Sequence, residues 1–527
     1  MKKLFFVTVV FLGLTVAHGQ TTFQKTYGGT YLFNEAYSLQ ETNDSGFIVT
    51  GYTRSFGAGL EDVYLIKTSP DGSLQWANTF GGTNVDYGTS VRQTNDMGFI
   101  VSGYTSFGVG WWDVYLIKTA SDGTLQWSQT FGGTGDDKAR SVEQTNDGGF
   151  IITGQSSSFG AGDNDIYLIK KFSDGTLQWA KTYGGTDGDY GLSAKETNDG
   201  GFIITGIIFG FGSGGYLIKT SSDGTLQWSK VFGGTGGGVG YSVQQTNDGG
   251  FILTGSSGNG AGYSDIYLVK TASDGNLQWE KTYGGWGYDY GQSVRQTNDG
   301  GYIIGGYTNS FTTNGFNDFY LLKTDSNGVL LWSKTYGETN GEDGFSAEQT
   351  KDGGFIIAGI INFGVGHNNF YLVKTDNNGN SGCNETNPNT IVTTPSTTVI
   401  NPSTQSSSGG IVSNPPTQTG SGGTTTTFCY MGINDVSYNN LITIFPNPFS
   451  TQTTLHTDNH FHNATFTVYN SQGKRVKQMT NISGQTVTIS RDNLPRGLYF
   501  IRLTTPSPSK GEGWGEVVAT GKLIVTD

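Results

Sequence analysis

Several residue types that support common enzyme chemistries are scarce in this sequence. Its 527 residues include 2 cysteines, 5 histidines and 4 methionines, and charged residues make up 14%. His367 is the one histidine between Gln20 and Gly382. A Ser-His-Asp triad in this long region would depend on that single residue, so we expect none. We also predict no metal centre and no cofactor.

Positive charge is scarce as well. The formal net charge is −13 at pH 7, and the 30 lysines and arginines form no basic stripe. Because nucleic-acid binding depends on neutralising phosphates, the sequence argues against a nucleic-acid partner. After the first 19 residues no stretch is long and apolar enough to span a membrane, so we expect no membrane span.

The first residues have the pattern of a secretory signal. Lys2 and Lys3 form a short basic region, residues 4–16 form an apolar core, and residues 17–19 are Ala-His-Gly. This order predicts a signal peptide over residues 1–19 and an exported mature protein.

The two cysteines, Cys383 and Cys429, lie in the exported part of the chain. An oxidising compartment permits a disulfide between them. Sequence alone does not show that they approach each other. Two alternatives stay open, a disulfide or two unrelated free thiols.

Glycine is abundant, with 84 residues, and much of it belongs to an internal repeat. Three phrases, of the types SDGTLQWSKTYGG, QTNDGGFIITG and DIYLIKT, each recur seven times. The aromatic residue of the first phrase stands at Phe23, Trp76, Trp127, Trp179, Trp228, Trp279 and Trp332. Repeats of about 50 residues predict a propeller or a solenoid.

Each repeat predicts four short antiparallel strands. In the repeat over residues 140–185, an alternating stretch at 141–145 precedes apolar runs at 150–153, 166–170 and 177–183. Gly-rich turns separate these runs, and no helical period is present. Four such strands are typical of one propeller blade.

The two ends of the array are complementary. The chain enters with a fourth strand, at residues 23–29, and leaves after a third strand, at residues 371–374. The N-terminal strand is therefore expected to complete the last unit, which removes open edges. We predict an all-β protein with a seven-bladed β-propeller of four-stranded blades over residues 20–382.

Parts of the repeat resemble known propeller families. The order FIITG, DIY and LQW resembles a kelch unit, and DGxLxW is similar to the tryptophan-bearing repeat of quinoprotein dehydrogenases. The spacing of Asp71 and Trp76 is close to the Asp-box of sialidases. These resemblances cover residues 20–383 and imply propeller geometry. They imply no single activity: a sialidase needs an arginine triad, and the array has only Arg54, Arg92, Arg140 and Arg295.

The loops of one predicted face vary between repeats and are rich in aromatic residues. Binding residues usually lie on variable loops held by a rigid scaffold, and exposed aromatic planes suit sugar rings. The predicted ligand-binding residues are Trp111, Trp112, Trp286, Tyr288, Tyr263 and Phe316. The alternative is that these aromatics pack the loops onto the ring.

An acidic residue precedes the first-strand serine by four positions in most repeats. The predicted acidic ring consists of Asp86, Asp137, Asp189, Asp289 and Glu342. Such a ring near the mouth of a channel would suit acid–base work on a sugar or Ca²⁺ binding. The alternative, which repetition favours, is that each carboxylate caps its own loop.

Charges also alternate two residues past that serine, as in Arg92, Glu143 and Lys195. We predict ion pairs between neighbouring blades that set their register.

The composition changes after the array. Residues 383–440 are rich in Thr, Ser, Pro and Gly, which predicts an extended, flexible linker. Residues 441–527 predict a small β-sandwich-like module. Its motif residues are Pro446, Asn447, Pro448, Gly473, Gly497, Tyr499 and Lys522.

This set of motifs resembles the type A C-terminal sorting domain of the type IX secretion system of Bacteroidetes. The resemblance covers about the last 85 residues. It implies recognition by the type IX machinery, translocation across the outer membrane, and release or attachment at the cell surface.

The sequence therefore predicts an exported, monomeric propeller that acts as a binding or adhesion module for an extracellular glycan or protein. Two alternatives stay open, a glycan-active hydrolase or lyase that uses loop carboxylates, and a structural surface protein.

Overall fold

The computed structural model describes most of the chain and divides it into two compact units, Met1–Gly432 and Ile433–Asp527. The described residues are 20–29, 32–209, 214–233, 237–312, 314–337, 340–363, 367–395, 398–400, 402, 405–413, 417–431, 442–447, 449–470, 474–492, 494–505 and 516–526. Within these ranges every regular element is a β-strand. The predicted signal peptide, residues 1–19, lies outside them.

The repeats of the first unit fold into seven antiparallel sheets, each starting with three strands that follow one another in the sequence. The first strands are β2 (Asn34–Glu41), β6 (Asp86–Gln93), β10 (Asp137–Gln144), β14 (Asp189–Glu196), β18 (Val239–Gln245), β22 (Asp289–Gln296) and β26 (Glu342–Gln349). The second strands are β3 (Phe47–Thr53), β7 (Phe99–Thr105), β11 (Phe150–Ser156), β15 (Phe202–Ile208), β19 (Phe251–Ser257), β23 (Tyr302–Thr308) and β27 (Phe355–Asn362). The third strands are β4 (Asp62–Thr68), β8 (Asp113–Thr119), β12 (Asp165–Lys171), β16 (Gly214–Thr220), β20 (Asp265–Thr271), β24 (Asp318–Thr324) and β28 (Asn368–Thr375).

A fourth strand carries the tryptophan phrase in six sheets. These strands are β5 (Leu74–Gly81), β9 (Leu125–Gly132), β13 (Leu177–Gly184), β17 (Leu226–Gly233), β21 (Leu277–Gly284) and β25 (Leu330–Tyr336). In the seventh sheet the fourth strand is β1 (Thr22–Gly28), which pairs antiparallel with β28. The N-terminal strand thus completes the last sheet, as the offset between the ends of the array predicts.

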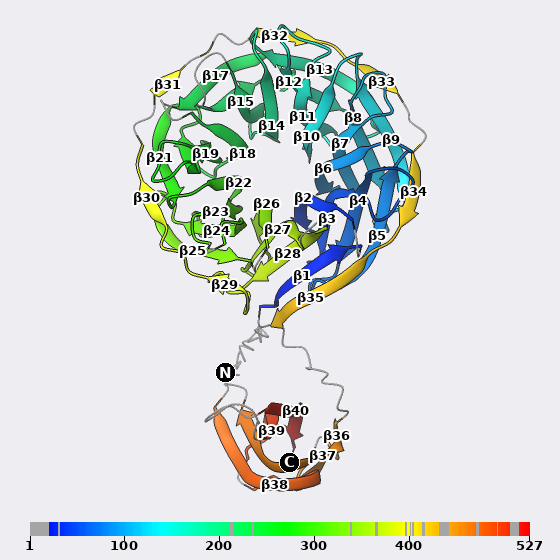
Figure 1. The fold of residues 1–527 in the computed structure, drawn as a ribbon, viewed down its shortest axis with the longest axis vertical. Coiled ribbons are helices and arrows are strands. Elements are labelled where there is room, and N and C mark those ends of the chain that lie inside the picture. Colours follow the sequence, from blue (N-terminus) through cyan, green and yellow to red (C-terminus); the bar gives the residue numbers. More distant parts are fainter. Residues whose placement is uncertain are drawn as a thin grey trace, which may run out of the picture. The chain divides into compact units, whose positions relative to one another are not determined.

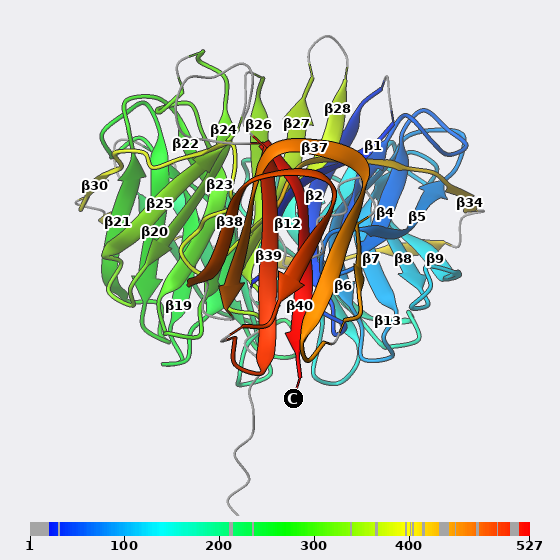
Figure 2. The same ribbon diagram turned by 90° about the horizontal axis from the view of Figure 1, so that it is seen from below.

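The seven sheets are arranged in chain order around a common centre, with the first strands innermost (Figure 1), and their turns and loops lie at two opposite faces (Figure 2). The apolar core lies between neighbouring sheets, because the middle strands are buried on both faces. One such cluster joins the seventh sheet to the first and contains Phe23, Leu39 and Phe370.

One hydrogen bond of the same kind links each sheet to the next, which makes seven bonds in all. The backbone N–H of Asn43, in the turn after β2, donates to Gln93 Oε1 at the end of β6 (2.8 Å). The same bond recurs between each pair of neighbours at 2.7–2.9 Å, from Asn95 to Gln144, Asn146 to Glu196, Asn198 to Gln245, Asn247 to Gln296 and Asn298 to Gln349. The seventh bond runs from Lys351 N to Glu41 Oε2 (2.8 Å) and joins the last sheet to the first.

Packing between sheets also accounts for the tryptophan phrase. Trp76 on β5 lies against Gly123, in the turn between β8 and β9 of the next sheet. Gly123 has a φ of +83°, and a Cβ there would lie 3.0 Å from the indole ring. Only glycine combines this backbone angle with this close approach.

The segment after the array differs from the predicted flexible linker. Within residues 385–431 the chain passes the sheets in reverse order and adds a fifth strand to each, which we call the belt (yellow to gold in Figure 1). The belt strands are β29 (Glu385–Thr386), β30 (Ile391–Thr393), β31 (Thr398–Ile400), β32 (Gln405–Ser408), β33 (Ile411–Ser413), β34 (Gln418–Ser421) and β35 (Thr424–Met431).

The belt forms despite its polar composition because strand addition to an exposed edge uses backbone groups. It covers the outer edges of the fourth strands, which would otherwise present unpaired N–H and C=O groups. The predicted linker of residues 383–440 therefore belongs largely to the first unit, which extends to Gly432.

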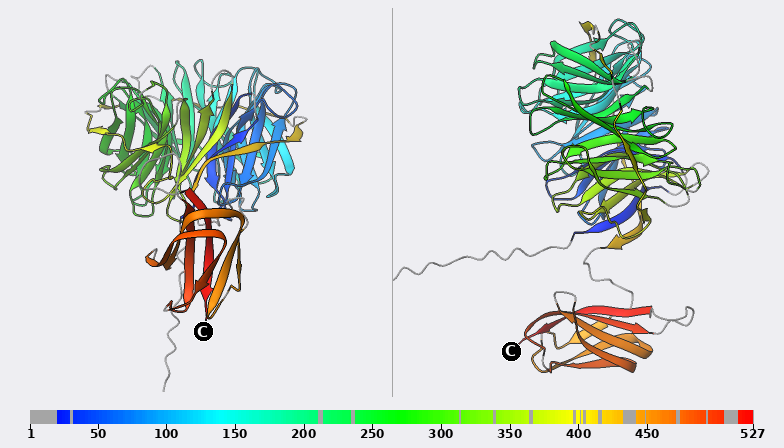
Figure 3. Two further views of the ribbon diagram at one scale, coloured as in Figure 1. Left: turned by 60° about the horizontal axis from the view of Figure 1, so that its bottom comes forward. Right: turned by 90° about the vertical axis from the view of Figure 1, so that its left-hand side faces the viewer.

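The second unit is a small β-structure with its own core. Its strands are β36 (Ile442–Phe445), β37 (Gln452–Asn470), β38 (Arg475–Ser490), β39 (Gly497–Thr505) and β40 (Glu516–Val525), drawn orange to red in Figure 3. The long β37 pairs with β38 along one edge and with β36 and β39 along the other. Leu455, Phe466 and Leu503 belong to the buried core.

The belt yields a stability prediction. A chain ending at residue 382 lacks the belt, whereas one ending at residue 431 keeps it and lacks only the second unit. We expect the shorter chain to melt about 5 °C lower or more and to associate, because seven strand edges become exposed. Thermal unfolding and size-exclusion chromatography check this expectation. Equal melting temperatures and two monomeric proteins would contradict it.

Candidate functional site

A β-bulge in each first strand turns one side chain toward the common centre of the seven sheets. In β2 the register with β3 shifts between Ala36 and Ser38, which leaves Tyr37 unpaired. Bulges commonly re-aim a side chain in this way. The shift recurs in all seven first strands, and the bulged residues are Tyr37, Thr89, Arg140, Leu192, Tyr241, Gln292 and Phe345.

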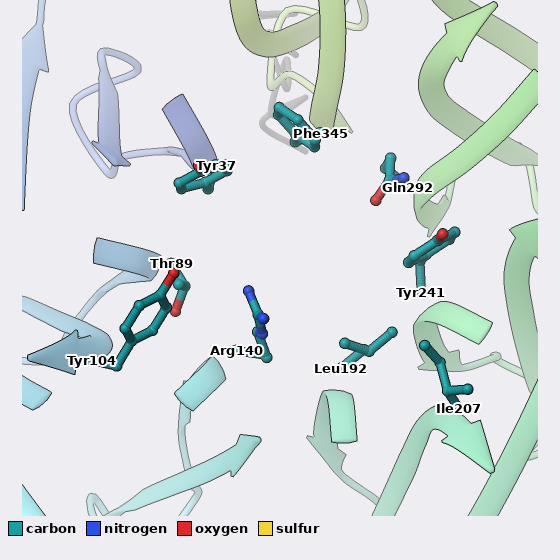
Figure 4. Close-up of a pocket in the computed structure, with 9 residues that line it drawn as sticks. All are labelled: Tyr37, Thr89, Tyr104, Arg140, Leu192, Ile207, Tyr241, Gln292 and Phe345. Atoms are coloured by element: carbon teal, nitrogen blue, oxygen red, sulfur yellow. The ribbon is translucent and has the colours of Figure 1, made fainter. Parts of the chain in front are cut away.

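These seven bulged residues, together with Tyr104 and Ile207, line a central cavity of about 400 Å³. Figure 4 shows the nine side chains placed around its open middle. The volume falls within the range of small-molecule and saccharide pockets. Every sheet contributes at least one residue, so the cavity depends on all seven sheets.

One side of the cavity continues into a chain of aromatic contacts, which we call the aromatic arc. Phe345 contacts Tyr37 with ring centroids 5.4 Å apart, and Tyr104 contacts Trp112 at 5.3 Å. Successive centroids along the arc lie 4.7–6.4 Å apart. Its members are Tyr263, Tyr288, Tyr290, Tyr307, Phe345, Tyr37, Tyr52, Tyr87, Tyr104 and Trp112.

The predicted ligand-binding aromatics take two kinds of position. Trp111 and Trp286 are 81% and 78% exposed on their loops, and Phe316 is exposed as well. Trp112, Tyr263 and Tyr288 belong to the arc. The remaining residues of the arc were missed by sequence reasoning. For two of them, Tyr37 and Phe345, a signal exists: the residue before each first-strand serine varies strongly in an otherwise regular repeat.

A second cavity, of about 420 Å³, shares Tyr37 and Phe345 with the first and contains two carboxylates. Tyr37 Oη donates to Glu35 Oε2 (2.9 Å), and Asn317 Nδ2 donates to Asp343 Oδ1 (2.7 Å). Burial raises the pKa of Asp343 above its ordinary value, and the charge of Glu35 adds to this effect. Neither carboxylate belongs to the predicted acidic ring.

The predicted acidic ring is buried. Asp86, Asp137, Asp189, Asp289 and Glu342 each begin a first strand and are 0% exposed. The Asp86 carboxylate accepts the N–H of Gly82 (2.8 Å), and that of Asp289 accepts the N–H of Gly285 (2.9 Å). The four aspartates hold the loop before their strand in this way. None of the five carboxylates borders the central cavity.

The predicted ion pairs between neighbouring sheets are present around Glu143. Its carboxylate binds Arg92 Nε at 3.2 Å on one side and Lys195 Nζ on the other. Despite burial, these cations lower the pKa of Glu143 to about 2. Burial lowers the pKa of Lys195 to about 7, with Glu143 opposing the shift.

Cys383 is disulfide-bonded. The backbone of Cys429, the other cysteine of the chain, pairs with Gln24, whose Nε2 donates to the carbonyl of Cys383 (2.5 Å). The side chain of Cys429 lies outside the described residues. No group of three or more His, Cys, Asp or Glu residues suited to a metal ion occurs in the described part of the chain.

The motif residues of the second unit lie on its turns and strands. Pro446 and Asn447 follow β36, Gly497 begins β39, and Tyr499 Oη donates to the carbonyl of Pro495 (2.6 Å). Lys522 lies on β40, with its backbone opposite Phe500. Pro448 and Gly473 lie outside the described residues.

The second unit belongs to a class of export signals. Residues 443–511 match the family described as the secretion system C-terminal sorting domain. The tail is a type IX sorting domain, as its motifs predict, so the protein is exported to the cell surface or the surroundings through interaction with the type IX machinery. Across the described residues no helix has the length and apolarity to cross a membrane.

No curated protein matches the chain. The solved structures that are similar to it at low identity include three with the following coverage. A protein of unknown function from Dyadobacter fermentans DSM 18053 aligns with a TM-score of 0.38 and 11% identity, over 67% of this chain and 98% of that one. The polysaccharide lyase Uly1 aligns with a TM-score of 0.40 and 9% identity, over 66% and 91%. The tail fiber of Staphylococcus aureus phage P68 aligns with a TM-score of 0.22 and 12% identity, over 56% and 50%.

The ion pairs of Glu143 yield a pH prediction. Its pKa is lowered on folding, so its contribution is complete above the unfolded value of 4.5 and is lost as the pH falls through about 2. We expect Glu143→Gln to lower the free energy of unfolding by about 1–3 kcal/mol at pH 7. The deficit should shrink below pH 4.5. Urea unfolding at pH 7 and pH 3 checks this, and a deficit independent of pH would contradict it.

Proposed function

We propose that this protein is an exported carbohydrate-binding module, built on a closed seven-bladed β-propeller, that binds an extracellular glycan at the aromatic arc and the central cavity. The observation that carries this proposal is the continuous arc of aromatic rings at the edge of a cavity to which all seven sheets contribute.

The propeller assignment rests on the bonds between sheets. The seven turn bonds include one from Lys351 to Glu41, between the last sheet and the first. The backbone N–H of Leu39 also donates to Ser346 Oγ (3.3 Å), as that of Val91 does to Ser38 Oγ (3.2 Å) between the first two sheets. Identical contacts at the first and last sheets favour closure over an open array.

A glycan suits the cavity better than a charged ligand. Aromatic rings present large apolar faces at low conformational cost, which favours stacking with sugar rings. The polar groups beside them, Gln292, Thr89 and the Arg140 guanidinium, offer hydrogen bonds to hydroxyl groups. Several loop aromatics are exposed beyond any need of loop packing, which disfavours a purely structural role.

This proposal predicts the effect of two aromatic substitutions. We expect Tyr104→Ala to weaken binding of a matching polysaccharide about tenfold, a loss of about 1.4 kcal/mol, because the variant removes a ring shared by the arc and the cavity. Trp111→Ala/Trp112→Ala should weaken binding as well. The measurement is titration calorimetry with residues 20–431 after a screen of polysaccharides.

The matched control is Phe172→Ala. Phe172 is exposed in the turn between β12 and β13, at the face opposite the binding loops, so its loss should leave affinity unchanged. Equal affinity of Tyr104→Ala and wild type for every glycan bound would contradict the proposed site. Binding of extracellular proteins alone would replace the glycan by a protein ligand.

The second cavity supports one alternative function, hydrolysis of a glycosidic bond. Asp343, whose pKa is raised, would donate its proton to the leaving oxygen. Glu35 would accept a proton from the water that attacks the anomeric carbon, so one C–O bond forms as the other breaks. Tyr37 and Asn317 would hold the two carboxyl groups in place.

This alternative predicts that wild-type protein releases reducing sugar from a bound polysaccharide. Glu35→Gln and Asp343→Asn should each lower the rate about 100-fold or more while binding persists. Asp136→Asn, at an exposed carboxylate beside Lys138, is the control and should keep full activity. Binding without sugar release in the wild type would leave the binding module as the function.

A further inference from the structure

Neighbouring sheets meet at a buried pair of carboxyl groups. Asp265 begins the third strand of the fifth sheet, and Asp289 begins the first strand of the sixth. Both approach Gly284, the last residue of β21, where a Cβ would lie 2.2 Å from Asp265 Oδ1 and 2.4 Å from Asp289 Oδ2. Glycine is required at this position because the two carboxyl groups occupy the space of a side chain.

The same arrangement recurs at five of the seven junctions. The pairs are Asp62–Asp86, Asp113–Asp137, Asp165–Asp189, Asp265–Asp289 and Asp318–Glu342, over Gly81, Gly132, Gly184, Gly284 and Gly337. Nine of these ten residues are at most 2% exposed. Burial of a charged carboxylate without a counter-charge is costly, so each pair needs a partner for its charge.

The two remaining junctions indicate what that partner is. At the junction between the seventh and first sheets, the positions hold Asn369 and Asn34, whose amide groups hydrogen-bond to each other (2.9 Å). At the junction between the fourth and fifth sheets, both positions are glycine, Gly214 and Gly238. The two positions are thus matched in kind at every junction, and a lone carboxyl group never occurs.

The matched pairs favour a proton as the shared partner. The Asn–Asn pair joins its two groups through one N–H. A carboxylic acid and a carboxylate of similar shape are joined in the same way through one O–H, which requires one proton per pair. A pair of glycines needs neither.

Among the described residues, no lysine or arginine acts on the carboxyl groups of Asp265 and Asp289. Asp265 Oδ2 accepts the N–H of Gly262 (3.0 Å), and Asp289 accepts the hydroxyl of Ser310 (2.6 Å), that of Thr308 and the N–H of Gly285. The titratable group that faces the pair from the next sheet is Tyr320 on β24. Asp265 Oδ1 is buried, has no hydrogen-bond partner and lies beside Gly284 next to the same position as Asp289 Oδ2.

We propose that the five buried carboxyl pairs are proton-binding sites between the sheets, each holding one proton shared by its two carboxyl groups, and that loss of these protons loosens the ring. This inference is independent of the ligand proposed above. A mildly acidic pH would therefore stabilise the junctions between the sheets of this exported protein.

The pKa values of Asp265 and Asp86 agree in direction with this proposal. Burial raises the pKa of Asp265 to about 6, with the charge of Asp289 adding to the shift, and burial raises the pKa of Asp86 to about 7. Because these values lie above the unfolded value of 3.8, the contribution is complete below pH 3.8 and is lost as the pH rises through about 6–7. The Lys–Asp pairs within each sheet, such as Lys270–Asp248, lower the aspartate pKa and titrate below this window.

The test compares the full-length wild type with Asp265→Asn/Asp289→Asn, which reproduces the pair already present at Asn369 and Asn34. Melting temperatures are measured from pH 4.5 to 8.5 in EDTA. We expect the wild type to melt progressively lower as the pH rises through 6–7. The melting temperature of the double variant should decline less steeply with pH. Relative to wild type, the double variant should therefore be more stable at high pH than at low pH.

Two further variants keep the test decisive. The single Asp265→Asn leaves an amide–carboxylate pair that needs no proton, so it should also flatten the pH profile, even if the double variant does not fold. Asp274→Asn, in an exposed turn of the same sheet, is the control and should leave the profile unchanged.

Three results would overturn the proposal. They are a wild-type melting temperature that does not fall between pH 5 and 8, parallel profiles for wild type and Asp265→Asn, and a Ca²⁺-dependent stabilisation that EDTA removes and the double variant lacks. The last result would assign the pairs to a bound cation.

Discussion

The hydrogen bond from each QTNDGG turn to the glutamine or glutamate of the next sheet is the constraint on which the rest of this structure depends. Each first strand ends in one such acceptor, and each following turn presents one backbone donor, so the sheets can repeat only at a fixed spacing and angle. The bond from Lys351 to Glu41 extends the same rule from the last sheet to the first. The apolar clusters, the tryptophan–glycine contacts and the carboxyl pairs all lie at the junctions that this bond sets.

The same junctions explain where function can arise. Seven equivalent sheets around a common centre leave two regions free to vary, the loops of one face and the bulged residue of each first strand. The first strand must pair with the second strand and also line the centre, and the bulge separates these two roles. The residues on either side of the bulge pair with the second strand, while the extra residue faces the centre. The strands can therefore keep their register while the bulged residue that lines the central cavity differs between sheets, as Arg140, Leu192 and Phe345 do.

Much of the fold could be predicted from the sequence, because turn glycines, apolar runs and the tryptophan phrase repeat with little change. The belt could not. Its Thr- and Ser-rich composition cannot bury a core, and the residues 383–440 were therefore expected to be flexible, but strand addition to an existing edge needs backbone groups and no core. The export tail was predicted from its motifs, because they are local and specific.

The site was predicted only in part, for a physical reason. Trp111 and Trp286 are recognisable as exposed loop aromatics, whereas Tyr37 and Phe345 sit within strands, where alternation alone assigns them no particular direction. In the sequence, the carboxylates that begin the first strands are recognisable as one recurring position of the repeat, here called a column. Their role depends on a second column, at the start of the third strands, and only the fold brings the two columns together.

The most direct test of this account is an X-ray structure of residues 20–431. The account predicts seven sheets in a closed ring, with the Lys351 N–H bonded to Glu41, the belt paired along every fourth strand, and the seven bulged side chains around one cavity. A gap between the seventh and first sheets, or a belt segment detached from the strand edges, would contradict it.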